Sequence, residues 1–551
     1  MQQYYKEKRL RDYRDLVNNS ATLYPKRTAF KLKIAEGKYR EITYAELRNY
    51  YYRFCTYLLK NGFGGKRIAV SGSNCFEWVL SYLSAATVGV AVPIDKELGA
   101  DDVNDFLESS FSSVMCTDSQ RITALKAVVK RDMTYIDFAD IEGICKSMTD
   151  VDCSVVDALP LDPNAMSILI FTSGTTGNSK GVCLSQSNVC ANIHSTLKMV
   201  KIKPDDSVLS ILPLHHTYEC TLDCLLVLSK GCCISYCEGV TKVARNLTEY
   251  SPTALVVVPA LLKVLNKRIK AAIIKDCPEK YRSNFENYSL SEALEKTPFL
   301  IRKVICGKVR KSLGGKIRLF IVGAADLDCT LVEDFMALGI RTLQGYGLTE
   351  CSPLLAANND FHFNPRSTGI AIPDVELKID NPNDEGVGEI IAKGENIMLG
   401  YYNDEESTAA VLKDGWFHTG DLGKFDENGD LFIKGRIKNV IVTENGKNIY
   451  PEELETRLSK FPEISEVLVY GFEDNGTANV KAKIFPNLDY LKEKFGRNPN
   501  DDEVRSAIQD TVKSVNKKIP KYKNIKAFEV LSAALEKTTT QKIKRFGQNT
   551  K

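Results

Sequence analysis

The sequence predicts an α/β protein, in which sheets are covered by helices. Short apolar runs alternate with amphipathic helical patterns through most of the 551 residues, which is typical of α/β layers. Residues 375–432 instead contain short segments separated by turn signals, which indicate a small β-rich subdomain. A compact α/β segment follows a boundary that we expect near residues 435–438.

Composition indicates a globular chain of more than one domain. Hydrophobic residues make up 44% and charged residues 26% of the chain, both ordinary for a soluble protein. The net charge of +3 gives no reason to expect nucleic acid as a partner. The sixteen cysteines are scattered without a CxxC pair, and the five histidines do not accompany them at zinc spacing. We therefore expect reduced, mostly buried thiols in a cytoplasmic protein.

The amino-terminal residues are basic and lack the apolar core of a secretory signal. The longest apolar stretch, residues 254–262, is interrupted by Pro259 and is too short to span a bilayer. These features predict a soluble protein without a transmembrane segment, and they leave peripheral membrane contact open.

Residues 171–181, FTSGTTGNSKG, carry the strongest functional signal. They follow an apolar run, residues 168–171, that is typical of a strand. Glycines let backbone N–H groups approach a ligand, hydroxyls add donors, and Lys180 adds a positive charge. This chemistry suits a polyphosphate, although the GxxxxGK[ST] pattern of a Walker A loop is absent. The apolar spacing of residues 189–200 predicts a helix beyond it, which places the loop at a strand-to-helix junction.

A second signal is the segment QGYGLTE, residues 344–350. An aromatic ring between glycines can lie against a planar base, and the Thr-Glu pair offers a hydroxyl and a carboxylate suited to Mg²⁺. An alternating strand pattern at residues 317–321 ends nearby in the chain at a tight Gly323-Ala324-Ala325 exit.

Three further segments gain meaning from their order. WFHTGD, residues 416–421, places a carboxylate on a tight turn that can accept ribose hydroxyls. KGRIKN, residues 434–439, precedes NGKNIYP, residues 445–451, where Pro451 opens a predicted helix through Lys460 and a strand is expected at residues 467–470. QKIKR, residues 541–545, lies in a carboxyl-terminal stretch with eleven basic and two acidic residues from Lys513 onward. Taken alone, each of these segments is typical of a turn or a charged surface.

In this order, the five elements resemble the adenylate-forming superfamily, from about Tyr24 to Arg545, and look most like long-chain fatty-acid–CoA ligases. The resemblance implies an amino-terminal domain, residues 1–435, of two α/β subdomains and a small β-barrel-like subdomain. It also implies a small mobile carboxyl-terminal α/β domain, residues 436–551, with a hinge near Lys438.

The resemblance also implies a role for each matching residue. The phosphate loop would comprise Thr172, Ser173, Gly174, Thr175, Thr176, Gly177 and Lys180. Tyr346, between Gly345 and Gly347, would stack on adenine near Gly323 and Ala324. Thr349 would contact the α-phosphate, and Glu350 would bind magnesium. Asp421 would bind ribose, Arg436 would add a ribose or phosphate contact, and Lys438 would form the hinge. Lys542 would bridge the substrate carboxylate and the α-phosphate, Gly446 would admit pantetheine, and His216 would gate the carboxylate pocket.

The implied activity is ATP- and Mg²⁺-dependent activation of a medium- or long-chain fatty acid to an acyl-adenylate, followed by transfer to CoA. Two alternatives remain open: transfer to the phosphopantetheine of an acidic acyl carrier protein, or a non-catalytic acyl-nucleotide sensor. For His216, the alternative is a buried core histidine. Three positions depart from the usual pattern of the family. Gln541 and Ala324 each stand where the family usually has glycine, and Asn439 stands where it usually has an acidic residue.

Overall fold

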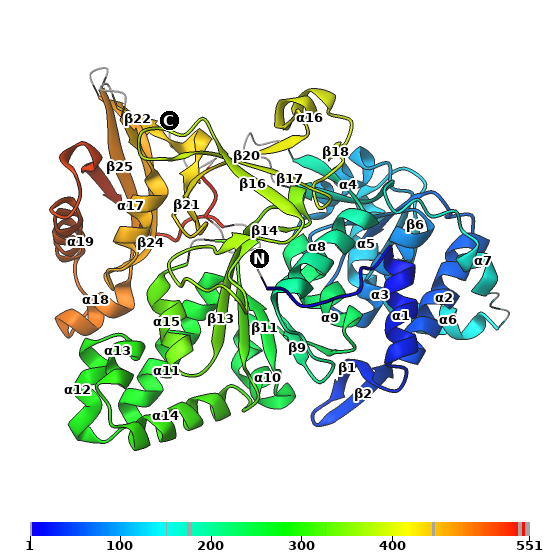
Figure 1. Ribbon diagram of the computed structural model, residues 1–551, viewed down its shortest axis with the longest axis horizontal. Coiled ribbons are helices and arrows are strands. Elements are labelled where there is room, and N and C mark those ends of the chain that lie inside the picture. The colour runs from blue at the N-terminus through cyan, green and yellow to red at the C-terminus, as the bar shows by residue number, and fades with distance from the viewer. Residues whose placement is uncertain are drawn as a thin grey trace. The chain divides into compact units, whose positions relative to one another are not determined.

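The computed structural model describes residues 3–149, 151, 153–172, 179–325, 327–443, 447–474, 477–537 and 543–545. By their internal contacts, these residues form two compact units. The first unit holds the described residues up to Leu377 and those from Ala392 to Phe417. The second unit holds Lys378–Ile391 and the described residues from His418 onward. Both units mix helices and strands, as the sequence predicts (Figure 1).

The first unit contains a seven-stranded sheet in the order β18-β8-β7-β4-β3-β5-β6. Strands β7, β4, β3, β5 and β6 run parallel, whereas β8 and β18 are antiparallel to their neighbours. The strands are β3 (Arg67–Val70), β4 (Val90–Pro93), β5 (Val114–Thr117), β6 (Thr134–Asp137), β7 (Met166–Thr172), β8 (Lys180–Ser185) and β18 (Gly400–Tyr401). Strands β3, β4, β5 and β7 are short and largely buried, as expected where a parallel sheet is covered on both faces.

A nine-stranded sheet of the same unit has the order β15-β14-β13-β12-β11-β9-β10-β1-β2. Its central strands are parallel, with antiparallel strands at the two edges. The strands are β1 (Thr28–Ala35), β2 (Lys38–Thr43), β9 (Ser207–Ser210), β10 (Cys233–Tyr236), β11 (Ala254–Val257), β12 (Leu319–Val322), β13 (Arg341–Gly347), β14 (Leu354–Ala357) and β15 (Ile370–Ala371). The strand predicted near residues 317–321 is therefore confirmed as β12.

Helices connect and cover these sheets (Figure 1). They are α1 (Tyr13–Leu23), α2 (Tyr44–Lys60), α3 (Phe76–Val88), α4 (Ala100–Ser109), α5 (Ser119–Val128), α6 (Phe138–Ser147), α7 (Cys153–Asp157), α8 (Gln186–Met199), α9 (Leu226–Ser229), α10 (Val243–Tyr250), α11 (Pro259–Asp276), α12 (Glu279–Asn287), α13 (Leu290–Glu295), α14 (Phe299–Ser312), α15 (Cys329–Ala337) and α16 (Glu405–Val411). A π-helix, Tyr218–Leu225, precedes α9. Among the described helices, none has the length and apolar character needed to cross a membrane.

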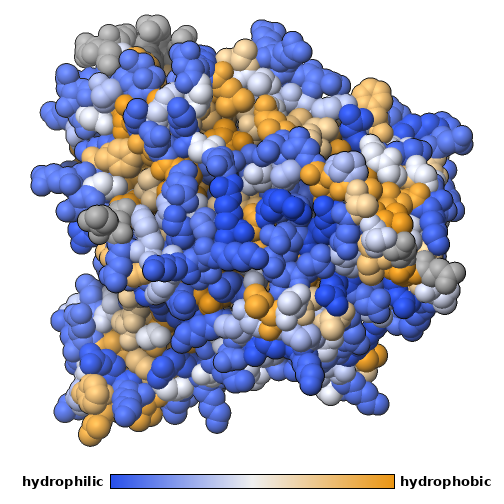
Figure 2. Space-filling view, turned by 45° about the vertical axis from the view of Figure 1, so that its right-hand side comes forward, coloured by the Kyte–Doolittle hydropathy of each residue, from blue (hydrophilic) through white to orange (hydrophobic). Residues whose placement is uncertain are grey.

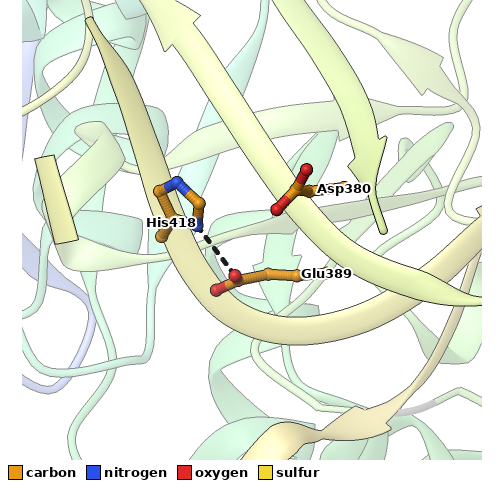
Figure 3. A group of neighbouring side chains, drawn as sticks. All are labelled: Asp380, Glu389 and His418. Atoms are coloured by element: carbon orange, nitrogen blue, oxygen red, sulfur yellow. Dashed lines mark hydrogen bonds and ion pairs between the residues drawn. The ribbon is translucent and has the colours of Figure 1, made fainter. Parts of the chain in front are cut away.

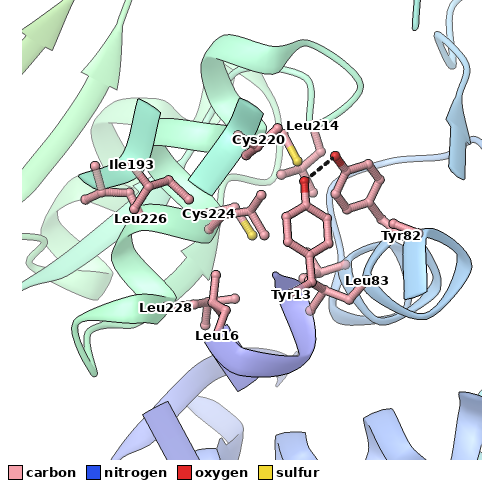
Figure 4. Packing of buried hydrophobic residues seen from close by; sticks show 14 of the residues in the cluster. Tyr13, Leu16, Tyr82, Leu83, Ile193, Leu214, Cys220, Cys224, Leu226 and Leu228 are labelled. Carbon is pink, nitrogen blue, oxygen red and sulfur yellow. Dashed lines mark hydrogen bonds between the residues drawn. The ribbon is translucent and has the colours of Figure 1, made fainter. Parts of the chain in front are cut away.

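The main core of the first unit joins α1, α3, α8 and the π-helix. Figure 4 shows the rings of Tyr13 and Tyr82 at its centre, with Cys220 and Cys224 of the π-helix beside them. The two hydroxyl groups lie 3.1 Å apart, so these buried phenols satisfy each other. The described cysteines are free thiols and most are buried, as expected.

A five-stranded sheet occupies the β-rich region that the sequence predicts. It comprises β16 (Val375–Asp380), β17 (Gly388–Gly394), β19 (Leu412–Lys413), β20 (Trp416–Phe425) and β21 (Leu431–Arg436). Further along, β24 (Ile464–Asp474), β25 (Thr477–Pro486) and β26 (Ile525–Val530) form a separate sheet with α17 (Pro451–Leu458), α18 (Leu488–Phe495), α19 (Asp501–Asn516) and the short pair β22 (Ile441–Val442) and β23 (Asn448–Ile449). The predicted helix at Pro451 and strand at residues 467–470 are confirmed.

One prediction about the phosphate loop is wrong. The segment after Phe171 does not lead from a strand into a helix, because residues 180–185 form β8, antiparallel to β7. The predicted helix, α8, begins only at Gln186, where Ser185 and Asn188 form a reciprocal capping box. Its apolar face is buried as predicted. The loop therefore joins the two strands of a hairpin.

Candidate active site

Two of the sequence-predicted segments meet at one edge of the nine-stranded sheet. Strands β12 and β13 are parallel, with Val322 paired to Gln344. The residues that follow, Gly323 and Gly345, therefore lie beside each other at the carboxyl edge, next to Tyr346. Ligands of open α/β sheets bind at such edges. The described geometry brings together the residues that the sequence assigns to adenine.

The turn after β12 is tightly constrained. A side chain at Gly323 would meet the ring of Tyr218 at 3.1 Å. Tyr218 donates its hydroxyl to the carbonyl of Ile321 at 3.1 Å, so the ring is fixed against this turn. Ala324 follows with a φ of 70°, in the left-handed region that favours glycine. The alanine noted from sequence thus occupies a conformation that suits glycine better.

The glycines beside Tyr346 have a structural reason that the sequence interpretation missed. A Cβ at Gly347 would lie 1.9 Å from the carbonyl oxygen of Pro353, and one at Gly345 would lie 2.8 Å from Leu354. Both glycines are therefore required for the close approach of β14 to β13. They keep the strand that carries Tyr346 in place, and this structural role does not depend on what the Tyr346 ring contacts.

Thr349 and Glu350 lie on a helical turn, Thr349–Cys351, directly after β13. Two buried asparagines hold the end of this turn. Asn192 and Asn396 each donate their side-chain amide to the carbonyls of Cys351 and Leu354, at 2.8 to 3.2 Å. The backbone carbonyl of Glu350 also accepts the N–H of Met398 at 2.8 Å. The Glu350 carboxylate is therefore presented from a fixed backbone.

A short chain of contacts links Glu350 to the hairpin of the phosphate loop. The hydroxyl of Tyr401 donates to Oε1 of Glu350 at 3.0 Å. The ammonium of Lys180 lies 4.7 Å from the centre of the Tyr401 ring, within the range of a cation–π contact. Lys180 also donates to the hydroxyl of Ser407 at 2.7 Å. A cation, an aromatic ring and a carboxylate are thus brought together from segments far apart in the chain.

The sequence interpretation missed Tyr401 and Ser407. Tyr401 reaches Lys180 because β18 pairs with β8, with Tyr401 opposite Val182. The aromatic pair after a glycine at residues 400–402 was the available signal, but the pairing that gives it a role depends on the tertiary fold. Thr172 lies opposite Lys180 at the described end of the hairpin.

His216 is a mostly buried residue beside His215, with ring centres 4.0 Å apart. Burial lowers the pKa of His216 to about 4, and burial also lowers the pKa of His215 well below its usual range. Both rings are therefore neutral at pH 7. A neutral His216 can gate or hydrogen bond, but it does not supply a positive charge to a carboxylate.

The same region contains a buried acidic pair that the sequence interpretation did not single out. Glu219 and Asp223 lie one turn apart on the π-helix and are fully buried. Glu219 accepts the hydroxyl of Ser210 at 2.6 Å. Burial raises the pKa of Asp223 to about 7 and raises that of Glu219 well above its usual range. Burial disfavours two negative charges here, so the pair retains a proton at neutral pH.

In the second unit, Asp421 and Arg436 lie opposite each other on β20 and β21. Nε of Arg436 donates to Oδ1 of Asp421 at 2.8 Å, and the Asp421 side chain is largely buried. This pairing orients the carboxylate that the sequence assigns to ribose. Lys438 follows on an exposed helical turn, Ile437–Asn439.

Glu389 fixes the turn that carries Asp421. Its Oε1 accepts the N–H of Gly420 at 2.9 Å, and its Oε2 lies 2.8 Å from Nδ1 of His418 (Figure 3). Gly420 has a φ of 71°, which a side chain would strain. Asp380 lies beside this pair, and the ligand atoms of the three residues lie within 4.8 Å of one another. The sequence interpretation missed Glu389 because it comes from a different strand.

Seven predicted site residues lie outside the described residues: Ser173, Gly174, Thr175, Thr176, Gly177, Gly446 and Lys542. The predicted site residues that the structure describes suit a magnesium nucleotide. One carboxylate and a neighbouring hydroxyl, Glu350 and Thr349, suit Mg²⁺, which takes few protein ligands beside phosphate oxygens. Lys180 supplies a cation close to that carboxylate. The donor set fits.

Comparison with known protein families defines the class. The family of AMP-binding enzymes matches residues 17–402, and the AMP-binding enzyme carboxyl-terminal domain matches residues 438–546. The chain belongs to the AMP-binding enzyme family, the adenylate-forming superfamily that the sequence resembles.

Individual relatives are distant. A rat long-chain-fatty-acid–CoA ligase 5 is 29% identical over 73% of this chain and 65% of its own length, so the chain spans about two thirds of that relative. A long-chain-fatty-acid–CoA ligase, FadD15, of Mycobacterium bovis is 26% identical over 93% of this chain and 91% of its own length.

Solved structures share the fold. An anthranilate CoA ligase with anthranoyl-AMP gives a TM-score of 0.76 at 19% identity, covering 99% of this chain and 97% of its own. An O-succinylbenzoate coenzyme A synthetase from Bacillus subtilis with ATP and magnesium gives 0.73 at 23% identity, covering 96% and 98%. The large amino-terminal and smaller carboxyl-terminal α/β parts expected from sequence are confirmed at this level.

Proposed function

We propose that this protein is an ATP- and Mg²⁺-dependent acid–thiol ligase that converts a medium- or long-chain fatty acid to its CoA thioester. The observation that carries the proposal is the contact chain from Lys180 through Tyr401 to Glu350. It gathers a cation and a carboxylate suited to Mg²⁺ beside the hairpin of the predicted phosphate loop. The names of the relatives support the fatty acid and CoA, and the nucleotide complexes of the structural neighbours support ATP.

Adenylation solves a chemical difficulty. A free carboxylate is a poor electrophile, because its leaving group would be oxide. When a carboxylate oxygen attacks the α-phosphorus of ATP, an acyl-adenylate forms and pyrophosphate leaves. The thiol of CoA then attacks the acyl carbon, which forms the thioester, releases AMP and gives up the thiol proton. The protein must chiefly align the reactants and neutralise charge on phosphate oxygens.

We assign these tasks to the residues of this chain. Lys180 and the loop before it would hold the β- and γ-phosphates, and Thr349 would donate its hydroxyl to the α-phosphate. Magnesium, when bound at Glu350, would neutralise phosphate charge. Tyr346 would position adenine and Asp421 the ribose. Lys542 would bridge the attacking carboxylate and the α-phosphate.

The second half-reaction needs a thiol where Lys542 would stand during the first. We propose that the carboxyl-terminal domain, residues 436–551, turns about Lys438 between the two steps and brings Gly446 to the pantetheine. Conformational gating of this kind separates steps that need different residues at one place.

The proposal is tested by pyrophosphate release with a panel of acids from acetate to long-chain fatty acids, without and with CoA. We expect release that depends on ATP, Mg²⁺ and a medium- or long-chain acid, and a thioester when CoA is present. Thioester formation with holo-acyl carrier protein but not with CoA would favour the carrier-protein alternative. The basic carboxyl-terminal stretch supports that alternative, because acyl carrier proteins are acidic. Absence of pyrophosphate release with every acid would leave the sensor alternative.

A further inference from the structure

Positive charge is concentrated in two parts of this nearly neutral chain, the carboxyl-terminal stretch from Lys513 onward and residues 259–316. Residues 259–316, which contain α11 to α14, carry fourteen basic and five acidic residues, a formal charge of +9. The whole protein carries +3. Acidic residues in the rest of the chain therefore balance these two basic segments. The net positive charge of such a segment attracts anionic partners.

The excess of basic residues is greatest in helix α14. Its sequence, FLIRKVICGKVRKS, contains five basic residues and no acidic one. Its inner face is buried through Ile305 and Val309, which pack in the local apolar core with α11. Among the described residues, no acidic side chain forms an ion pair with Lys303, Arg310 or Lys311; Lys308 lies 3.9 Å from Asp276.

The outer face of α14 is also unusually apolar. Phe299, Leu300 and Val304 are 65%, 74% and 59% exposed, and they occupy the first two turns. Their spacing places them on the same side as Lys303 and Lys311, away from the buried residues. Figure 2 shows orange hydrophobic surface among blue at its lower left.

We propose that the exposed face of α14 docks on an anionic lipid bilayer. Exposed phenylalanine and leucine beside several lysines and arginines are the combination that holds a helix in the membrane interface. The apolar side chains would enter the headgroup region, while the cations would meet anionic lipid. An acidic protein would account for the cations, but it would not require three large apolar side chains to face water.

Vesicle co-sedimentation of the full chain tests this proposal. The vesicles are phosphatidylcholine, with or without phosphatidylserine. We expect binding only to the phosphatidylserine vesicles, weakened by salt. The doubly substituted Phe299→Ser, Leu300→Ser variant should lose about tenfold or more in partitioning, as should the Lys303→Glu, Lys311→Glu variant.

Two matched controls keep the test specific. Val240→Ser removes an exposed apolar residue and Lys126→Glu reverses an exposed lysine, both outside residues 259–316; each should bind as the parent chain does. Circular dichroism and thermal unfolding verify that the α14 variants fold. Failure of the parent chain to bind, or undiminished binding by the Phe299→Ser, Leu300→Ser variant, would overturn the proposal, because the apolar face of α14 would then play no part in binding. The readout is independent of the proposed ligase activity.

Discussion

At the scale of single residues, Glu350 is the side chain to which we assign the magnesium ion. Its carboxylate is fixed by Tyr401 and by the turn that Asn192 and Asn396 hold. We expect Glu350→Gln to lower the rate of pyrophosphate release by roughly 10²–10³-fold, because one charged contact to the transition state is lost. Tyr401→Phe keeps the ring beneath Lys180 and removes only a hydrogen bond, so its effect should be much smaller. Equal rates for Glu350→Gln and the parent chain would contradict the assignment.

The acidic pair on the π-helix gives a prediction about pH. Burial raises the pKa of Asp223 from 3.8 to about 7 in the folded protein. Between these values, unfolding releases the Asp223 proton, so the Asp223 contribution to the free energy of unfolding falls as pH rises from about 4 to about 7 and changes no further above that. The slope is about 1.4 kcal/mol per pH unit for one proton.

Asp223→Asn cannot ionise and should flatten that dependence. Urea unfolding of the two proteins at several pH values between 4 and 8 measures it, with Asp105→Asn, an exposed acid, as the control. The Asn variant should gain stability relative to the parent chain as pH rises through this window. A parallel pH dependence of the two proteins would show that Asp223 does not carry the proton.

At the scale of elements, the turn between Thr419 and Asp421 is set by a neighbouring strand. Glu389 accepts the N–H of Gly420 and contacts His418. We expect Glu389→Ala to raise KM for ATP by about tenfold with a smaller change in kcat, because a ribose contact acts on ground state and transition state alike. Glu389→Gln retains an acceptor for Gly420 and should lie closer to the parent chain. A loss confined to kcat, or equal effects of the two substitutions, would argue against this positioning role.

Local patterns predicted the elements well. Apolar spacing gave α8 and β12, and Pro451 marked the start of α17. The hairpin at the phosphate loop was missed because residues 180–185 are explained as a strand only by their partners, β7 and β18. The same limit applies to the site. Motifs indicated Lys180 and Glu350, but Tyr401 and Glu389 act through pairings between distant segments, which no local pattern encodes.

At the scale of the whole molecule, the proposed cycle requires one rotation between two half-reactions. Lys438→Pro restricts the backbone at the proposed hinge. We expect acyl-adenylate to accumulate while thioester formation falls by at least about tenfold, because only the second step needs the rotated arrangement. Single-turnover assays that separate acyl-adenylate from acyl-CoA measure this. Lys438→Ala controls for the loss of the side chain, and a normal thioester yield from Lys438→Pro would contradict the rotation.

The proposed chemistry begins when a carboxylate oxygen attacks the α-phosphorus of ATP. The most direct measurement uses a fatty acid labelled with ¹⁸O in its carboxylate and follows the label by mass spectrometry after thioester formation. Attack at the α-phosphorus places one labelled oxygen in AMP and none in pyrophosphate. Unlabelled AMP, or label in inorganic phosphate with ADP as the nucleotide product, would contradict the account.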